Sequence, residues 1–316
     1  MNAPQAPYDC IIIGGGPAGL SAAIYLARFR RRVLVIDGGG GRMEMIPRSH
    51  NHPGYPDGIK GRDLLANMRA QAEKYGATLQ HGWVSAARKQ GDFFTVTVDG
   101  AEDDSITGTA PLTARTLLLA TGVINLRPDL DEAVHARALE QGLLRYCPIC
   151  DGYEVKDKRI GVIGSTDHGV AEALFLRQYS DAITLLALYS CDLDARDRAT
   201  LEEAGIAWEA TPIRTFDFDG DIARLTLEDA RTLDFDSIYP ALGSETRNEL
   251  GKMLGVDLCD ETCFKTDTEQ RSSVKGVYAA GDAVECLDQI SVAMGHGAIA
   301  ATAIHNDLRK ADGHID

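Results

Sequence analysis

The stretch that decides the fold is residues 10–19, CIIIGGGPAG. The β-branched run at residues 10–13, bounded by glycine, predicts a short buried strand. Gly14, Gly16 and Gly19 have the spacing of the dinucleotide-binding fingerprint. The first glycine permits a tight turn, the second lets the backbone approach a pyrophosphate, and the third lets the helix pack on the strand.

The segments that follow extend this fingerprint to a βαβ unit. Residues Pro17–Arg30 have helical spacing of apolar side chains, so the helix N-terminus would point free N–H groups at phosphates. Residues Val33–Ile36 read as the next strand, closed by Asp37. Asp37 lies 18 residues after Gly19, near the ~20 expected for a carboxylate that binds a ribose hydroxyl. These features in register favour a dinucleotide site over an ordinary glycine turn.

The rest of the N-terminal region completes a mixed α/β pattern. The glycine- and proline-rich segment Gly38–Gly61 predicts a long loop, and Arg62–Tyr75 a helix. Alternating patterns predict antiparallel strands at Trp83–Ala87 and Phe93–Val98. Residues Leu117–Gly122 predict a buried strand that ends in small residues, where a bulky side chain would block a ligand.

A second motif, Cys147-Pro148-Ile149-Cys150, lies near the middle of the chain. At this spacing one thiol can attack a partner disulfide and the other can resolve the mixed disulfide. Asp151 follows directly and can move protons for a departing thiolate. The alternatives are inert thiols or half of a zinc site, which needs a second ligand pair. Only Cys259 and Cys263 are similarly close, and with Cys286 they are predicted to be structural.

A second, damaged βαβ pattern follows the Cys pair. Residues Ile160–Ile163 predict a strand, Val170–Gln178 a helix, and Ala182–Leu188 another strand. Thr166 occupies the middle glycine position of the loop between them, where a Cβ obstructs pyrophosphate. No arginine cluster follows the second strand to bind the 2′-phosphate of NADPH. Asp192 lies there instead, which leaves NADH as the alternative nucleotide. The sequence therefore predicts a Rossmann-like domain that holds NADPH or NADH poorly.

The C-terminal region repeats the strand-to-cofactor signals. Residues Tyr239–Gly243 look like a strand that turns toward a cofactor. Residues Val277–Asp282 look like a strand that ends in Gly-Asp, and the carboxylate there can accept a hydrogen bond from a polyol hydroxyl. Residues Ile290–Leu308 predict a long helix rich in alanine and glycine, whose N-terminus can approach a flat ring.

Composition narrows the class. The 316-residue chain is long enough for two domains, and 44% hydrophobic and 25% charged residues are typical of a globular protein. A net charge of −15 argues against nucleic acid and anionic membrane as partners. No apolar run reaches the ~20 residues of a membrane helix, and the N-terminus lacks a signal-peptide layout. We therefore expect a cytoplasmic protein, in which the seven cysteines would not form a structural disulfide framework.

The order of these motifs resembles the low-molecular-weight thioredoxin reductase family over nearly the whole chain. The Cys147–Gly152 box combined with the C-terminal Ala-Gly-Asp and Gln-Ile segments is the specific part. The resemblance implies an α/β fold of two Rossmann-like three-layer domains, the second inserted into the first. Residues 1–122 and 244–316 would bind FAD, and residues 123–243 would form a pyridine-nucleotide-binding-like domain that carries the redox Cys pair. It also implies a homodimer.

The resemblance also assigns site residues by position. Cys147 and Cys150 would be the redox disulfide, with Cys150 facing the flavin and Cys147 the partner, and Asp151 would be the acid. Residues carried over as FAD contacts are Gly14, Gly16, Pro17, Ala18, Gly19, Asp37, Asn51, Ala120, Thr121, Gly122, Gly281, Asp282, Gln289 and Ile290. No metal site is expected.

These features predict an FAD-dependent thiol–disulfide oxidoreductase. Its partner would be a thioredoxin-like protein or a small disulfide or dithiol. Thr166 and the missing basic cluster depart from the family, and some similar flavoproteins resemble ferredoxin-linked reductases, so ferredoxin or another electron donor stays open. One alternative is a dithiol oxidase that passes electrons to oxygen, although such oxidases commonly have His where this chain has Asp151. Another is a flavin-bound redox sensor or partner-binding module.

Overall fold

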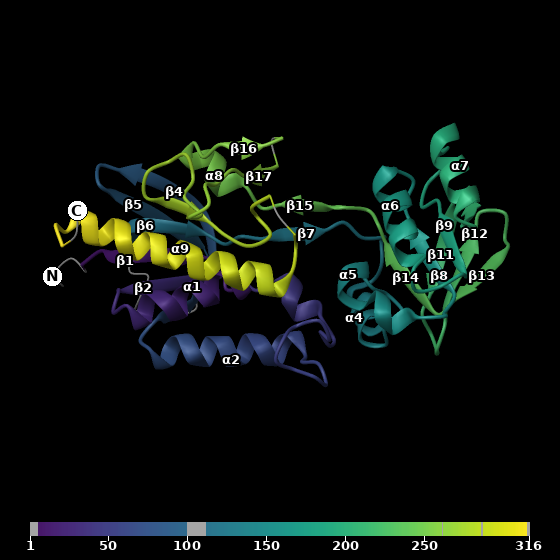
Figure 1. The fold of residues 1–316 in the computed structure, drawn as a ribbon, viewed down its shortest axis with the longest axis horizontal. Coiled ribbons are helices and arrows are strands. Elements are labelled where there is room, and N and C mark those ends of the chain that lie inside the picture. The colour runs from purple at the N-terminus through teal and green to yellow at the C-terminus, as the bar shows by residue number, and fades with distance from the viewer. Residues whose placement is uncertain (1–5, 100–111, 261, 286, 315–316) are drawn as a thin grey trace. The chain divides into compact units, whose positions relative to one another are not determined.

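The chain folds into two compact units. The structure is a computed structural model that describes residues 6–99, 112–260, 262–285 and 287–314. Unit 1 comprises Met1–Glu44, Gly61–Ile124 and Glu245–Asp316, and unit 2 comprises Met45–Lys60 and Asn125–Ser244 (Figure 1). The sequence placed residues 45–60 with the FAD-binding domain. They group with unit 2 because they contact it, and Met45 packs against its apolar core.

Unit 1 is built on one sheet. Its strands are β1 (Tyr8–Ile13), β2 (Val33–Asp37), β3 (Thr78–His81), β4 (Trp83–Gln90), β5 (Phe93–Asp99), β6 (Leu112–Leu119) and β18 (Val277–Ala279). The order β3-β2-β1-β6-β18 is parallel throughout. The other edge of β6 is shared, because residues 117–119 pair with β18 and residues 112–114 pair antiparallel with β5. β4 then pairs antiparallel with β5, as predicted.

Helices and a short hairpin complete unit 1. They are η1 (Arg42–Met45, a 3-10 helix), α1 (Pro17–Arg28), α2 (Gly61–Lys74), α8 (Glu249–Leu254), α9 (Ile290–Ala311), β16 (Leu258–Cys259) and β17 (Cys263–Phe264). The last residue of η1, Met45, already belongs to unit 2. α9 lies against α1, where Ser21 Oγ donates to the Met294 carbonyl at 2.9 Å. A Cβ on Gly297 would lie 2.2 Å from the Ala18 carbonyl oxygen, so only glycine permits this approach.

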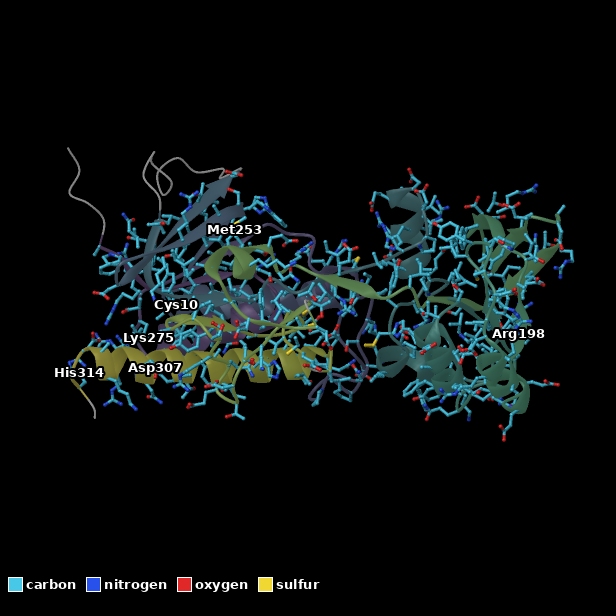
Figure 2. All side chains as sticks on the ribbon, turned by 90° about the horizontal axis from the view of Figure 1, so that it is seen from above. Cys10, Arg198, Met253, Lys275, Asp307 and His314 are labelled. Atoms are coloured by element: carbon cyan, nitrogen blue, oxygen red, sulfur yellow. A yellow bond between two sulfur atoms is a disulfide. The ribbon has the colours of Figure 1, made fainter. Side chains whose placement is uncertain are left out.

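The C-terminal half of α9 is fixed to the sheet by a half-buried polar cluster. Asp307, labelled on α9 in Figure 2, accepts a hydrogen bond from Tyr278 Oη on β18 at 2.6 Å. Arg271 Nε donates to the same carboxylate at 2.7 Å. A carboxylate with two such donors is well satisfied at low exposure.

Unit 2 repeats the strand order of unit 1. Its parallel sheet has the order β10-β9-β8-β14, from β8 (Ile160–Ile163), β9 (Ile183–Leu186), β10 (Ala207–Glu209) and β14 (Ser237–Pro240). A separate antiparallel sheet contains β11 (Ile213–Asp217), β12 (Ala223–Leu227) and β13 (Thr232–Phe235). The helices are α4 (Glu132–Glu140), α5 (Pro148–Asp151), η2 (Gly152–Val155), α6 (Asp167–Leu176) and α7 (Ala195–Glu203). The predicted α/β class with two Rossmann-like units is confirmed.

Alternate residues of the unit 2 strands face different layers. Ile163 and Ile238 belong to the apolar cluster shared with the antiparallel sheet and α4. Val162 and Tyr239 belong to the cluster shared with α6 and α7. This is the two-residue period of a strand buried on both faces, and it directs Tyr239 to the face where the Cys motif lies.

Two short strands, β7 (Val123–Asn125) and β15 (Ser244–Thr246), pair with each other where the chain passes between the units. Among the residues that the structure describes, no helix is both long and apolar enough to span a membrane.

Candidate active site

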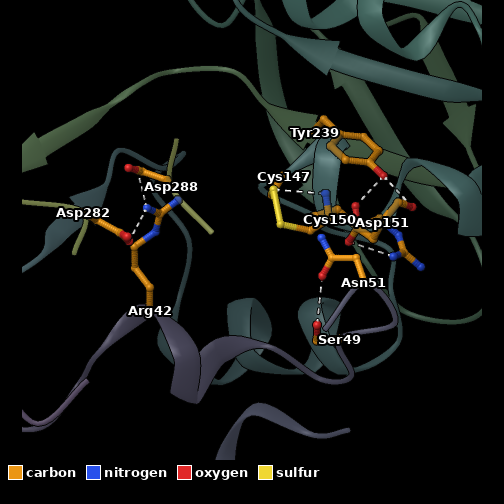
Figure 3. The surroundings of a disulfide bond; sticks show 10 residues. Arg42, Ser49, Asn51, Cys147, Cys150, Asp151, Tyr239, Asp282 and Asp288 are labelled. Carbon is orange, nitrogen blue, oxygen red and sulfur yellow. Dashed lines mark hydrogen bonds and ion pairs between the residues drawn. A yellow bond between two sulfur atoms is a disulfide. The ribbon is translucent and has the colours of Figure 1, made fainter. Parts of the chain in front are cut away.

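The two cysteines of the central motif form a disulfide in unit 2 (Figure 3). Their Cα atoms are 5.2 Å apart, a normal separation for a disulfide. Cys147 precedes α5 with Pro148 at the first helical position, which suits the fixed φ of proline. The Cys150 N–H points at Cys147 Sγ at 3.2 Å, so it would stabilise a thiolate on Cys147.

Asp151, which follows Cys150 in the chain, is held by two side chains (Figure 3). Arg145 Nη1 donates to Oδ2 at 2.9 Å and Tyr239 Oη donates to Oδ1 at 2.8 Å. Burial raises the pKa of the Asp151 carboxyl, and the Arg145 charge and the Tyr239 hydroxyl oppose that rise. The carboxyl therefore holds a proton to higher pH than a surface aspartate does, as a proton donor to thiolates requires.

Local backbone geometry fixes Arg145. Gly142 has φ +70°, and a Cβ there would lie 2.6 Å from Arg145 Nη2. Arg145 Nε donates to the Gly142 carbonyl at 3.1 Å, and the Arg145 N–H donates to Ile238 O at 2.9 Å. Because Ile238 directly precedes Tyr239, one stretch of β14 positions both partners of Asp151.

A chain of polar contacts leads through the buried His135 to Tyr146, which directly precedes Cys147. Arg127 Nη1 contacts His135 Nδ1 at 3.3 Å, and His135 Nε2 contacts Tyr146 Oη at 2.9 Å. Arginine can only donate, so Nδ1 accepts and the neutral ring carries its proton on Nε2, which donates to Tyr146. Burial and the Arg127 charge lower the pKa of His135, while burial raises the pKa of Tyr146. His135 is therefore neutral at pH 7.

The fingerprint glycines of unit 1 have three different surroundings. A Cβ on Gly14 would lie 2.1 Å from Ala120 O, and one on Gly19 would lie 2.0 Å from Gly14 O. A Cβ on Gly16 would have nothing within 4 Å. Gly16 precedes α1, and Pro17 and Ala18 begin the helix. The two outer glycines are required by packing, and the middle one leaves open space at a helix N-terminus.

Asp37 closes β2 beside this loop. Arg69 Nη2 from α2 donates to its Oδ2 at 2.7 Å, and the Gly39 N–H donates to Oδ1 at 3.1 Å. A Cβ on Gly15 would lie 2.4 Å from Oδ2, so the carboxylate touches the glycine loop. A cavity of about 550 Å³ opens here, lined by residues that include Asp37, Glu44 and Arg69.

The other expected FAD residues of unit 1 fall into two groups. Ala120 donates its N–H to Ile13 O at 2.9 Å, and Thr121 Oγ1 donates to Arg247 O at 2.6 Å. Gly122 has φ +65° and accepts from the Arg247 N–H at 3.0 Å. This group therefore lies beside Gly14 at the ends of β1 and β6.

The second group surrounds the start of α9. Arg42 Nη1 bridges Asp282 Oδ2 at 3.0 Å and Asp288 Oδ2 at 2.7 Å (Figure 3). Burial and the Asp288 charge raise the pKa of Asp282 to about 6, although Arg42 opposes the rise. Gly281 has φ +79°, with Ala18 2.9 Å from a would-be Cβ. Gln289 and Ile290 are the N-cap and first residue of α9.

Asn51 belongs to unit 2, whereas these groups belong to unit 1. It lies in the segment Met45–Lys60, which packs with unit 2, and its Oδ1 accepts from Ser49 Oγ at 3.0 Å. Figure 3 draws both residues with the disulfide of the same unit.

The second glycine loop differs at its centre. A Cβ on Gly164 would lie 3.0 Å from Gly169 Cα, so these two glycines pack as Gly14 and Gly19 do. Thr166 precedes α6 where Gly16 precedes α1. On α6, His168 Nε2 contacts Glu172 Oε1 at 3.1 Å, and burial raises the pKa of Glu172 to about 7.

The residues of unit 1 fit a dinucleotide such as FAD. The open space at Gly16 admits phosphates to the α1 N-terminus, and the adjoining cavity with Asp37 admits an adenosine. Among the described residues, no group of three or more His, Cys, Asp or Glu side chains is arranged to hold a metal ion.

A dinucleotide loop in one unit and an exchangeable disulfide in the other define the chemistry of a disulfide oxidoreductase. The sequence profile of the pyridine nucleotide-disulphide oxidoreductase family matches residues 8–297, so the chain belongs to that family. It is an FAD-dependent disulfide oxidoreductase related to thioredoxin reductases, as the sequence predicted.

Relatives agree over most of the chain. Thioredoxin reductase of Streptomyces clavuligerus is 34% identical, covering 93% of this chain and 91% of the relative. That of Mycolicibacterium smegmatis is 31% identical, covering 99% and 100%. Among solved structures, HlmI has a TM-score of 0.88 at 28% identity, covering 98% of this chain and 95% of that one. Thioredoxin reductase from Streptococcus pyogenes MGAS5005 has a TM-score of 0.84 at 27% identity, covering 97% and 100%.

Several polar partners were absent from the sequence prediction. They are Arg42, Arg69, Arg145, His135 and Tyr239. Each meets its partner through the tertiary fold, and no local motif marks it.

Proposed function

We propose that this protein reduces the disulfide of a thioredoxin-like protein or of a small molecule. Electrons would pass through FAD in unit 1 and the Cys147–Cys150 pair in unit 2. The observation that carries the proposal is the disulfide beside the half-buried Asp151, whose pKa is raised by burial. The relatives named thioredoxin reductase at 31–34% identity support the same class of partner.

The exchange steps follow from the residues of the motif. Once the pair is reduced, Cys147 attacks the partner disulfide, because the Cys150 N–H stabilises its thiolate. Cys150 then attacks Cys147 Sγ, which restores the internal disulfide and releases the partner as a dithiol. Asp151 supplies a proton to the departing thiolate, and Arg145 and Tyr239 keep the carboxyl in place. FAD, when bound, supplies the two electrons that reduce the pair.

We propose further that NADPH and NADH are poor donors. Thr166 places a side chain where unit 1 leaves open space at Gly16, and pyrophosphate needs that space. The electron donor would then be ferredoxin or another reductant.

Anaerobic stopped-flow mixing with NADPH, NADH and dithiothreitol in turn tests both proposals through flavin absorbance. We expect fast bleaching by dithiothreitol and slow bleaching by the nucleotides. The variant Cys150→Ser should lose reduction by dithiol, whereas the matched variant Cys191→Ser, at a free thiol, should keep it. Wild-type rates in Cys150→Ser would refute the thiol route, and fast bleaching by NADPH would refute the role given to Thr166.

The second candidate is a dithiol oxidase, which the same Thr166 favours because electrons would then enter from a dithiol. Release of peroxide when a dithiol is added in air, with no response of the flavin to NADPH, would identify it. Slow turnover with every donor would instead point to a redox sensor.

The homodimer implied by the family resemblance stays a prediction. Light scattering coupled to size-exclusion chromatography gives the mass directly, and a mass of one chain would contradict it.

A further inference from the structure

Unit 1 contains a second pair of cysteines, which lie opposite each other on two adjacent strands. The hairpin of β16 and β17 places Cys259 directly opposite Cys263. Both are free thiols at intermediate exposure. Directly opposed residues of antiparallel strands have β-carbons about 4.5–5.5 Å apart, and a disulfide needs about 3.5–4.5 Å. An approach of about 1 Å therefore suffices to join them.

The hairpin is fixed in this register. Phe264, which is fully buried, donates its N–H to Ala283 O at 2.8 Å. Asn248 Nδ2 donates to Thr262 O at 2.7 Å. A slip of one residue would expel Phe264 from the core, so the two thiols stay opposed.

We propose that Cys259 and Cys263 form a second reversible dithiol–disulfide couple, exchanging with small-molecule disulfides. Two thiols and one small disulfide become one internal disulfide and two small thiols, so two electrons and two protons leave the hairpin. This assigns a redox role to thiols that the sequence alone predicted to be structural.

The surroundings set the order of attack. A hydrogen bond and the negative charge of Glu285 raise the pKa of Cys259, so this thiol is the poorer thiolate. Cys263 Sγ lies 3.6 Å from Thr246 Oγ1. In the order that we propose, Cys263 attacks the small disulfide first, and Cys259 resolves the mixed disulfide, because Glu285 is hydrogen-bonded to the Cys259 thiol and is placed to accept its proton.

The position of the couple gives it a consequence. Ala283 accepts the hydrogen bond from the Phe264 N–H. It directly follows Gly281 and Asp282, which are expected to contact FAD. One backbone hydrogen bond therefore connects the hairpin to the segment expected to contact the flavin.

Peptide mapping of the wild-type holoenzyme tests the proposal without any substitution. Cleavage after Lys and Arg gives one peptide, Met253–Lys265, with both hairpin thiols, and another, Tyr146–Lys156, with both thiols of the central motif (Met253 is labelled in Figure 2). The protein is reduced, equilibrated with mixtures of reduced and oxidised dithiothreitol, and labelled with a maleimide after denaturation. Mass spectrometry then counts the labels on each peptide.

We expect Met253–Lys265 to change from two labels to none, with little singly labelled peptide. Two labels retained in excess oxidant, or a dominant single label or mixed adduct, would overturn the proposal. Tyr146–Lys156 in the same digest reports the proposed main function separately.

The variants Cys259→Ser and Cys263→Ser test the order of attack with a small linear disulfide. Cys259→Ser should trap a stable mixed disulfide at Cys263, and Cys263→Ser should form its adduct more slowly. Equal adduct rates would overturn the assigned order, and flavin absorbance verifies that both variants fold.

Discussion

Replacing Tyr239 by phenylalanine removes one hydroxyl from the site and leaves the ring. Tyr239 is fully buried, and its hydroxyl donates to Asp151 Oδ1 at 2.8 Å. A hydrogen bond to a charged group contributes about 1.5–3 kcal/mol, so the folding equilibrium of Tyr239→Phe should fall by a factor of roughly 10 to 100. The ring keeps its packing, so no cavity adds to this loss.

The loss should depend on pH with a definite sign. The Tyr239 hydrogen bond lowers the pKa of Asp151, so its removal raises that pKa further. A carboxyl whose folded pKa lies above its unfolded value contributes stability at low pH that disappears as pH rises through the folded value. The variant should therefore be most destabilised at alkaline pH. The pH limb of disulfide reduction that needs the protonated acid should move to higher pH.

Urea denaturation at acid and alkaline pH measures the first effect. The second is read from the rate at which the reduced enzyme is reoxidised by a small disulfide without oxygen. Tyr189→Phe is the matched control, because Tyr189 is 73% exposed and lies away from the motif in sequence. An unmoved pH profile with equal destabilisation at both pH values would refute the role given to Asp151.

Three further outcomes are expected. Gly16→Ala should fold normally and bind FAD weakly, whereas Gly14→Ala should fail to fold, because its Cβ would lie 2.1 Å from Ala120 O. Flavin titration of the soluble protein distinguishes the two variants. Full FAD affinity in Gly16→Ala would contradict the assignment of the phosphates to the open space at Gly16. Thr166→Gly should strengthen binding of NADPH or NADH, measured by calorimetry, and unchanged affinity would mean that another residue blocks the site. Burial raises the pKa of Glu172 from 4.5 to about 7, so wild-type stability should fall by about 3 kcal/mol as pH rises across that window. Glu172→Gln should flatten this slope in urea denaturation, and a retained slope would assign it to another group.

The elements with strong periodicity were predictable. The run CIIIGGGPAG predicted β1, the turn and the start of α1, because β-branched residues and glycines act locally. The predicted bounds of the strand at Ile160–Ile163 agree with those of β8 at both ends. The spacing of Cys147 and Cys150 allowed a disulfide but left a zinc site or inert thiols open, and the resemblance assigned the disulfide that the structure contains.

The contacts that complete the site were not predictable. Tyr239 meets Asp151 across 88 positions, and only the pairing of β14 with β8 brings it there. Arg42 lies in a segment predicted to be a loop, and nothing local indicates that it bridges two carboxylates. Met45–Lys60 groups with unit 2, and Met45 packs against the apolar core of that unit. A boundary drawn from composition does not detect such a contact.

The contact between α9 and α1 determines when unit 1 can finish folding during biosynthesis. Gly297 packs on Ala18, but it leaves the ribosome 269 residues after α1 ends at Arg28. At a synthesis rate of about 5–20 residues per second, the apolar face of the nascent α1 stays exposed for roughly 15 to 60 s before α9 can pack on it. Unit 2 is translated in that interval and can fold first, whereas unit 1, with its coenzyme pocket, can mature only after the last helix has been released.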